Sequence, residues 1–169
     1  MENKHILTVS EFKELARPTS KHIDESEVST FIRECEDMHI IPAVGLDTFE
    51  ELTAEEVADD RKILLDGGVW TDKCGKRQKC SGLKMALAYF VYGKMMMADG
   101  AIVTRTGLMQ HNDEYASRTD DKNRVRRYND VMNVAEAYLD GCLAYWKIVK
   151  GDDVKPVRGS RVHIHAIGD

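Results

Sequence analysis

Apolar residues recur at helical spacing along most of the chain, and the most regular run lies near its C-terminal end. There the apolar positions alternate at spacings of three and four residues: Val125, Tyr128, Met132, Ala135, Leu139, Cys142, Trp146 and Val149. This pattern predicts one helix over residues 121–150, about 45 Å long at 1.5 Å per residue. Because the other expected helices are too short to cover such a length, we expect another subunit to complete part of its apolar face.

Residues 81–98 predict a helix of a different kind, since SGLKMALAYFVYGKMMMA is apolar on nearly every face. A helix of this type is surrounded by other elements, so we place it at the centre of the core. Lys84 and Lys94 leave only residues 85–93 uncharged between them, far fewer than the roughly 20 residues that span a bilayer. We therefore expect no membrane association.

Earlier in the chain, three segments have the form of a capping box, with a polar cap and a glutamate three residues later: Thr8–Glu11, Asp24–Glu27 and Thr53–Glu56. They predict a short helix that ends before Pro18, a second helix that Pro42 closes, and a third that runs to Gly67. Between the second and third, Leu46, Phe49 and Leu52 predict one or two further turns.

Three segments lack helical spacing. Residues 67–82 are glycine-rich and basic, which predicts a loop with Trp70 as its apolar anchor. Residues 101–111 are β-branched and favour an extended chain around Ile102 and Val103. Alternation over residues 161–167 predicts a strand that pairs with the Ile102 region, pairs with a neighbouring chain, or stays mobile.

The predicted fold class is all-α: a compact helical bundle with a central buried helix, a long C-terminal helix, and a short strand-like loop and tail. The chain has 169 residues, the usual size of one domain. We therefore predict a single helical domain over residues 1–150, followed by a tail over residues 151–169 whose short strand is suited to pairing between subunits.

Charge is divided unevenly along the chain. Residues 1–66 contain 17 acidic and 7 basic side chains, whereas residues 67–169 contain 12 acidic and 17 basic ones. Such an asymmetry has three explanations: the acidic and basic surfaces meet within one molecule, they meet between identical neighbours, or the basic half contacts nucleic acid. The pattern leaves all three arrangements open.

The densest basic group is the candidate surface for a neighbouring subunit or for DNA, and it comprises Arg118, Lys122, Arg124, Arg126 and Arg127. Arginines at the start of a helix oppose its macrodipole, so an acidic partner is expected to compensate them. The acidic half of a neighbouring copy would serve as well as packaged DNA. Lys73, Lys76, Arg77 and Lys79 form a second basic group.

The sequence indicates no catalytic, cofactor or metal site. Cys74 and Cys80 could meet His163 and His165 around zinc, but their spacing is not that of a zinc knuckle. No signal peptide precedes the first helix, so we expect a cytoplasmic protein with reduced thiols, which disfavours a disulfide between Cys74 and Cys80. No glycine-rich phosphate loop follows a strand, and none of the six histidines stands out as a base.

Three parts of the chain resemble the head-tail connector proteins of tailed bacteriophages and prophages, also called neck, adaptor or head-completion proteins. ILTVSEFKELARP is similar to their N-terminal lead-in, and SGLKMALAYFVYGKMMM to their central helix. TRTGLMQHNDEYASRTDDKNRVRRYNDVMNVAEAYLDGCLAYW is similar to their loop and final helix, including a Thr-x-Thr-Gly turn, here Thr104 to Gly107, and a Glu-Tyr pair, here Glu114-Tyr115. The acidic segment 46–66 and the loop around Cys74 and Cys80 depart from the simplest connectors.

The resemblance implies a virion structural protein: an α-helical, non-enzymatic subunit of a homo-oligomeric ring, commonly of twelve copies, that joins the portal and capsid to the tail. It implies portal and tail proteins as partners, non-specific contact with packaged DNA, no cofactor, and a place in the virion or, for a prophage, in the host cytoplasm. Two other classes stay open. One is a small helical regulatory or nucleic-acid-binding protein, and the other is an enzyme with perturbed titratable groups in a pocket.

Overall fold

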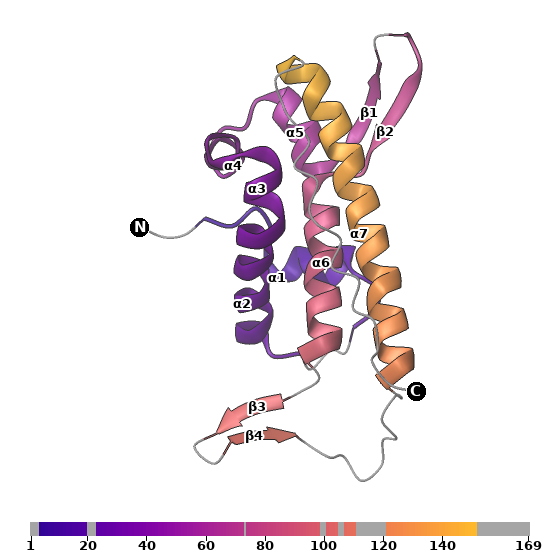
Figure 1. The fold of residues 1–169 in the computed structure, drawn as a ribbon. Coiled ribbons are helices and arrows are strands. Elements are labelled where there is room, and N and C mark those ends of the chain that lie inside the picture. The colour runs from indigo at the N-terminus through magenta and orange to yellow at the C-terminus, as the bar shows by residue number, and fades with distance from the viewer. Residues whose placement is uncertain are drawn as a thin grey trace.

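Helices make up most of the chain, with two short β-hairpins between them (Figure 1). The structure, a computed structural model, describes residues 4–19, 23–72, 74–98, 101–104, 107–110 and 121–151. Its helices are α1 (Val9–Leu15), α2 (Glu25–Cys35), the π-helix η1 (Glu36–Ile40), α3 (Ile41–Val44), α4 (Leu46–Leu52), α5 (Asp59–Asp66), α6 (Leu83–Ala98) and α7 (Asp121–Lys150). Its strands are β1 (Gly68–Thr71), β2 (Arg77–Cys80), β3 (Ala101–Thr104) and β4 (Gly107–Gln110).

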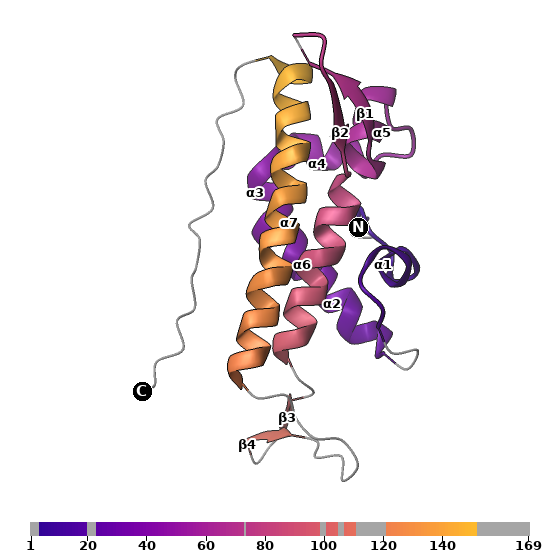
Figure 2. The same cartoon turned by 90° about the vertical axis from the view of Figure 1, so that its right-hand side faces the viewer.

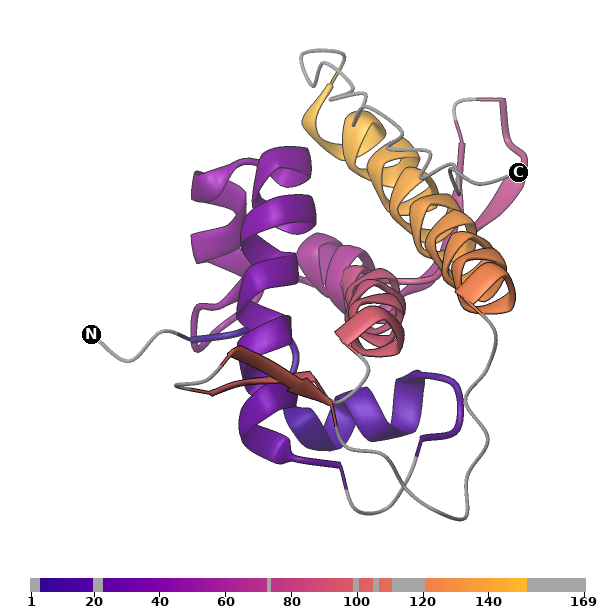
Figure 3. The same cartoon turned by 60° about the horizontal axis from the view of Figure 1, so that its bottom comes forward.

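Helix α6 lies at the centre of the bundle, as its sequence predicts. It packs against α7 along its length and contacts α2, α5, α1 and η1 on its other sides. Viewed from the β3–β4 end, α6 is enclosed by α7, α1 and the column of α2 and α3 (Figure 3). Its side chains Leu83, Leu87 and Val91 have no exposed surface. None of the described helices combines the length and the apolar character that crossing a membrane requires.

The close packing of α6 on α7 depends on Gly93. A Cβ atom at this position would lie 3.1 Å from Met132 Sδ and 3.6 Å from Val131 on α7. The missing side chain therefore lets the two longest helices approach each other. At the other end of the pair, Trp146 fills the core with 1% of its surface exposed.

The first helix begins and ends where the sequence predicts. The Thr8 side chain accepts a hydrogen bond from the Glu11 backbone N–H, and the Glu11 carboxylate accepts one from the Thr8 backbone N–H, which completes the capping box. Helix α2 begins after Asp24, whose carboxylate accepts a hydrogen bond from the Ser26 backbone N–H. Both side chains satisfy backbone donors that a helix start leaves open.

The prediction that Pro42 closes the second helix is wrong. The helical path continues from α2 through η1 and α3, and it ends at Gly45, which has φ +88°. Proline lacks a backbone N–H and crowds the preceding turn of an α-helix. The wider turn of η1 falls just before Pro42, which then occupies the first turn of α3. A backbone N–H in the first turn of a helix has no intrahelical acceptor, so the N–H that proline lacks is not missed there.

The third predicted helix start is also wrong. Helix α5 begins at Asp59 after Ala58, and no side chain caps it, so Thr53–Glu56 does not act as a capping box. The Thr53 hydroxyl instead donates to the carbonyl oxygen of Phe49 at the end of α4. Leu46–Leu52 does form the short helix that its apolar spacing predicts, and α5 does end at Gly67.

Residues 67–82 form a β-hairpin, where the sequence analysis predicts a loop. Strand β1 pairs antiparallel with β2, and Trp70 lies opposite Gln78. Asp72 shapes the turn, since its carboxylate accepts hydrogen bonds from the backbone N–H groups of Cys74 and Lys76. The hairpin projects beside α7 and α5 at the end opposite β3 and β4 (Figure 2). The chain is therefore mostly helical rather than all-α.

The extended chain predicted around Ile102 and Val103 is present as β3. It pairs antiparallel with β4, which the sequence analysis does not predict, and Ile102 lies opposite Met109. Thr104 and Gly107, the first and last residues of the predicted turn, lie opposite each other in the register of the two strands. The predicted C-terminal strand, residues 161–167, and Glu114-Tyr115 lie outside the described residues.

Helix α7 spans the predicted residues, but the face that it buries is shifted. Val131, Ala135 and Cys142 are fully buried, whereas Val125 is half-buried and Val149 is 38% exposed. An α-helix drifts about 20° per heptad against a strict a/d repeat, so the ends of a long seam turn away from a straight neighbour. Surplus apolar surface thus remains at the C-terminal end of α7.

Candidate functional site

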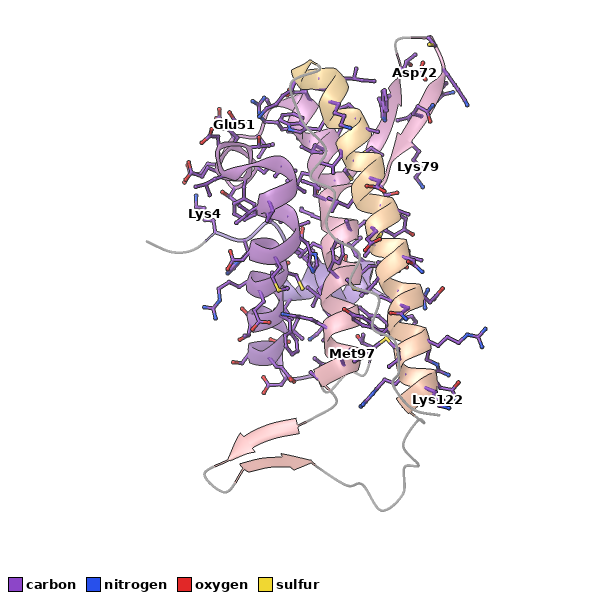
Figure 4. All side chains as sticks on the ribbon, viewed as in Figure 1. Lys4, Glu51, Asp72, Lys79, Met97 and Lys122 are labelled. Atoms are coloured by element: carbon purple, nitrogen blue, oxygen red, sulfur yellow. The ribbon has the colours of Figure 1, made fainter. Side chains whose placement is uncertain are left out.

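The first basic group lies on the first two turns of α7. Lys122, Arg126 and Arg127 are exposed, Arg124 is half-buried, and Arg118 lies outside the described residues. Figure 4 shows Lys122 at the end of α7 that is next to the end of α6. Among the residues that the structure describes, the three exposed cations form no ion pair. Their charge is available to a partner of the molecule.

The second basic group lies on the β1–β2 hairpin, close to the opposite end of α7. Lys76, Arg77 and Lys79 are all exposed, and Lys73 lies outside the described residues. Strand β2 contacts α7, so both basic groups belong to one side of the molecule. Figure 4 shows Lys79 and Lys122 on this side. We call it the basic face, defined by Lys76, Arg77, Lys79, Lys122, Arg126 and Arg127.

The acidic side chains gather on α2, η1 and α4, which lie across α6 from the outer side of α7 (Figure 3). Residues 24–60 contain 13 acidic side chains and a single basic one, Arg33. We call this side the acidic face, defined by its exposed carboxylates Glu25, Glu27, Asp37, Asp47, Glu50 and Glu51. The unequal division of charge along the sequence is therefore a division between two sides of the folded molecule.

Ion pairs between the two halves of the chain use Arg17 and the lysines of α6. Arg17 Nη2 lies 2.9 Å from Asp130 Oδ2 on α7. Lys84 Nζ lies 2.7 Å from Glu11 Oε1 and 2.8 Å from Asp66 Oδ1. Lys94 pairs with Glu34 on α2. Helix α7 also donates hydrogen bonds to the acidic half, from Lys150 Nζ to Thr48 Oγ1 at 2.8 Å and from the Tyr145 hydroxyl to the Asp60 carbonyl oxygen at 2.9 Å. Pairing within the molecule thus leaves the cations of the basic face and much of the acidic face for other contacts.

Each charged face also carries exposed apolar side chains. Met38 on η1 and Leu46 on α4 are 59% and 57% exposed on the acidic side. Val69 on β1 is 56% exposed on the hairpin, and Val149 near the end of α7 is partly exposed. Large apolar side chains at such exposure, set among charges, are typical of surfaces that contact another protein.

Perturbed titratable groups cluster where α2 meets η1, but their contacts explain them structurally. Glu36 is 2% exposed, and its carboxylate lies 2.6 Å from His5 Nδ1 and accepts a hydrogen bond of 2.9 Å from the Ile6 backbone N–H. Burial raises the pKa of Glu36, although the hydrogen bonds from these two donors act to lower it. The residue fastens the N-terminal lead-in to the bundle.

Two further groups near this position are also held in the core. The His39 ring stacks on Phe90 with a centroid distance of 4.1 Å, and burial lowers its pKa. Burial raises the pKa of the Cys35 thiol to about 12, so this cysteine is a poor nucleophile at neutral pH. Neither group faces a base or an acid in a way that indicates catalysis.

The structure separates the cysteines that the sequence analysis considers together. Cys74 is exposed in the turn of the hairpin, whereas Cys80 is buried at the far end of β2, against Cys142 of α7. His163 and His165 lie outside the described residues. Within the described ranges, no three histidine, cysteine or acidic side chains come close enough to hold a metal ion. Sequence separation conceals the Cys80–Cys142 contact, because its partners are 62 residues apart.

Residues 40–148 match the model of a family of unknown function, DUF6712. The chain belongs to this family. The DUF6712 segment runs from the end of η1 almost to the end of α7, so it includes both hairpins and both basic groups but omits α1 and α2. No curated protein and no solved structure matches the chain.

Proposed function

We propose that this DUF6712 protein is a structural, non-enzymatic subunit of a phage or prophage head-tail connector ring, which joins the portal and capsid to the tail. The resemblance of the lead-in, of α6 and of the chain from Thr104 through α7 to connector proteins supports this proposal. As a connector subunit it resides in the virion, or in the host cytoplasm when a prophage expresses it. The portal and tail proteins are its partners.

The observation that carries the proposal is the placement of an acidic face and a basic face on opposite sides of one bundle. In a ring, each copy presents one surface to the preceding neighbour and a different surface to the next. Two opposite faces of opposite charge satisfy this head-to-tail contact without two-fold symmetry. Such a contact also compensates the arginines at the positive end of the α7 dipole.

Charge sets the orientation of this contact more than its strength. Exposed ion pairs contribute about 0–1 kcal/mol each and are screened beyond about 8 Å at physiological salt. Apolar contact has to supply most of the affinity, and each face offers it through Met38 and Leu46 on one side and Val69, opposite Lys79, on the other. We therefore propose a weak contact that closes a ring at high concentration or on the portal.

A pair of complementary charge reversals tests the proposal. Variant A carries Lys122→Glu, Arg126→Glu and Arg127→Glu, and variant B carries Asp37→Lys, Asp47→Lys and Glu50→Lys. These positions are exposed, and within the described chain they form no ion pairs, so both variants keep the fold. Circular dichroism checks their helix content.

Each variant alone places like charges at every head-to-tail contact, so neither is expected to form rings. An equimolar mixture restores opposite charges at every contact when A and B alternate, and we expect rings from the mixture in sedimentation velocity and negative-stain images. Assembly of variant A alone contradicts the proposed faces. Duplex binding is measured for the wild type, for variant A and for the mixture. If the wild type binds duplex DNA, variant A does not, and the mixture does not restore binding, the result supports the nucleic-acid-binding alternative instead.

The biological role has its own test. Deletion of the gene from its phage or prophage is expected to yield filled heads and free tails that do not join. Tailed, infectious particles from the deletion contradict the connector role whatever the purified protein does.

A further inference from the structure

Two of the four cysteines meet inside the molecule, although they are far apart in sequence. Cys80 is the last residue of β2, and Cys142 lies in the second half of α7. Their sulfur atoms are 3.4 Å apart, and both residues are free thiols with 1% and 0% of their surfaces exposed. This contact joins the β1–β2 hairpin to the longest helix.

The surroundings of the two sulfurs suit thiol chemistry. The hydrogen bond with Cys142 and one from the Gly82 backbone N–H lower the pKa of Cys80 to about 7, although burial opposes this. The same hydrogen bond and burial raise the pKa of Cys142. Of the two thiols, Cys80 is therefore the one that gives up its proton more readily.

We propose that Cys80 and Cys142 form an oxidisable dithiol whose disulfide fastens the β1–β2 hairpin to α7. A disulfide bond is about 2.0 Å long, so the sulfurs need to approach by little more than an ångström. The oxidant is a small-molecule disulfide such as glutathione disulfide. This inference does not depend on the connector role.

The reaction proceeds by two thiol–disulfide exchanges. The Cys80 thiolate attacks one sulfur of glutathione disulfide, which forms a mixed disulfide and releases a glutathione thiolate. Cys142 then gives up its proton to solvent and attacks Cys80 Sγ, which forms the Cys80–Cys142 bond and releases a second thiolate. Two protein thiols are oxidised, and one molecule of glutathione disulfide is reduced to two thiols.

Access to the dithiol requires the hairpin to leave α7 briefly. Cys80 would move out with β2, while Cys142 stays on α7. The hairpin contacts α7 through β2 and α5 through β1, and the Trp70 ring lies on Tyr145 with a centroid distance of 5.6 Å, so these contacts would have to open. The disulfide would prevent this opening, so the oxidised and reduced forms differ in how firmly the hairpin is held.

The other two cysteines do not fit the same role. Cys74 is exposed in the hairpin turn, at the opposite end of β2 from Cys80. Cys35 lies on α2, and the raised pKa of its thiol makes it unreactive. Cys74 would nevertheless react with an oxidant in solution, so the test removes it.

The test compares Cys74→Ser with the matched control Cys74→Ser/Cys142→Ala, each treated with glutathione disulfide at neutral pH under native conditions. We expect the first protein to lose the mass of two hydrogen atoms and to yield a peptide with Cys80 joined to Cys142. Its melting midpoint is expected to rise relative to the reduced form, because the cross-link closes a long loop of the unfolded chain.

The control is expected to gain no cross-link and no stability, and to carry at most a glutathione adduct on Cys80. Circular dichroism checks that it is folded, and Cys142→Ser replaces Cys142→Ala if it is not. Three results for the Cys74→Ser protein overturn the proposal: an unchanged mass, a persistent glutathione adduct without a cross-link, or a cross-link that includes Cys35.

Discussion

Gly67 and Gly82 pack backbone against backbone at the base of the β1–β2 hairpin. Both have positive φ, +93° and +91°, and a Cβ atom on Gly82 would lie 2.6 Å from the backbone nitrogen of Gly67. A Cβ atom on Gly67 would lie 2.7 Å from the Ser81 carbonyl oxygen. The chain therefore enters and leaves the hairpin through one crossing that only glycine fits.

Gly82→Ala is expected to destabilise the fold by about 2–4 kcal/mol, from the strained φ and from the clash with backbone atoms that cannot move away. Gly75→Ala is the matched control, because Gly75 has φ +78° but nothing within 4 Å of its Cβ position. It is expected to cost only about 1 kcal/mol. Urea unfolding measures both, and equal costs would show that the crossing contributes nothing.

Lys84 joins three helices through its contacts with Glu11 on α1 and Asp66 on α5. Burial tends to raise the pKa of Glu11, but the hydrogen bonds from Lys84 and Thr8 outweigh it and lower that pKa below 4.5. A carboxyl group whose pKa is lower in the folded state stabilises the fold above the unfolded pKa, and the effect is lost as pH falls through the folded value.

Lys84→Met is therefore expected to lower stability by roughly 1 kcal/mol at pH 7, and the deficit against wild type should shrink as pH falls below about 4.5. Unfolding free energies measured between pH 3 and pH 7 test this. A deficit that is constant over the whole range would assign the role of Lys84 to packing of its alkyl chain.

Glu36 is the buried anchor of the lead-in. Glu36→Ala leaves the Ile6 backbone N–H without its acceptor, which costs about 1–3 kcal/mol, whereas Glu36→Gln keeps a carbonyl oxygen in place and is expected to cost less. The readouts are the urea midpoint and proteolysis of the first helix. A larger loss for Gln than for Ala would contradict this account of the contact.

The elements that the sequence predicts well are those in which one periodic pattern decides the structure. Helix α7 has the predicted bounds because its apolar repeat is sustained over many turns. Helix α6 lies in the core because almost every side chain is apolar. The Thr8–Glu11 box forms as predicted because both of its hydrogen bonds are local.

The elements that the sequence analysis misses depend on tertiary contacts or on competing local rules. Pro42 is a helix breaker in isolation, and the π-turn of η1 accommodates it. Strands β1 and β2 are only four residues each, and Trp70 holds them on Tyr145, which lies 75 residues further along the chain. The Thr53 hydroxyl donates to a carbonyl oxygen at the end of α4, so it does not cap the start of α5 as the sequence pattern predicts.

The candidate surface was predictable in part. Charge counts along the chain indicate acidic and basic halves, and the structure places them on opposite sides of α6. The basic group on the hairpin and the group on α7 are far apart in sequence, and only the contact of β2 with α7 brings them to one face. Long-range contacts such as Cys80 with Cys142 leave no local signal in the sequence.

Leu87 and Leu139 provide a graded test of the core. Leu87 has no exposed surface, whereas Leu139 is only partly buried at the edge of the cluster. Leu87→Ala is expected to cost about 2–5 kcal/mol and Leu139→Ala about half as much, while Val149→Ala should cost little. Thermal unfolding ranks the three variants, and a larger loss at Val149 than at Leu87 would contradict the assigned burial.

The last prediction follows from the proposed head-to-tail contact and concerns its apolar part. Leu46→Ser and Val69→Ser replace exposed side chains on the acidic face and on the hairpin of the basic side, so each should leave the melting midpoint within about 1 °C of wild type. If apolar contact supplies most of the affinity, each change weakens self-association several-fold at high salt, where charge attraction is screened. Sedimentation equilibrium at about 0.5 M salt measures this, with Ser10→Ala on α1 as a surface control outside both faces. Two results together would mean that charge alone joins the subunits. They are loss of wild-type association at high salt, and unchanged association of Leu46→Ser and Val69→Ser at low salt.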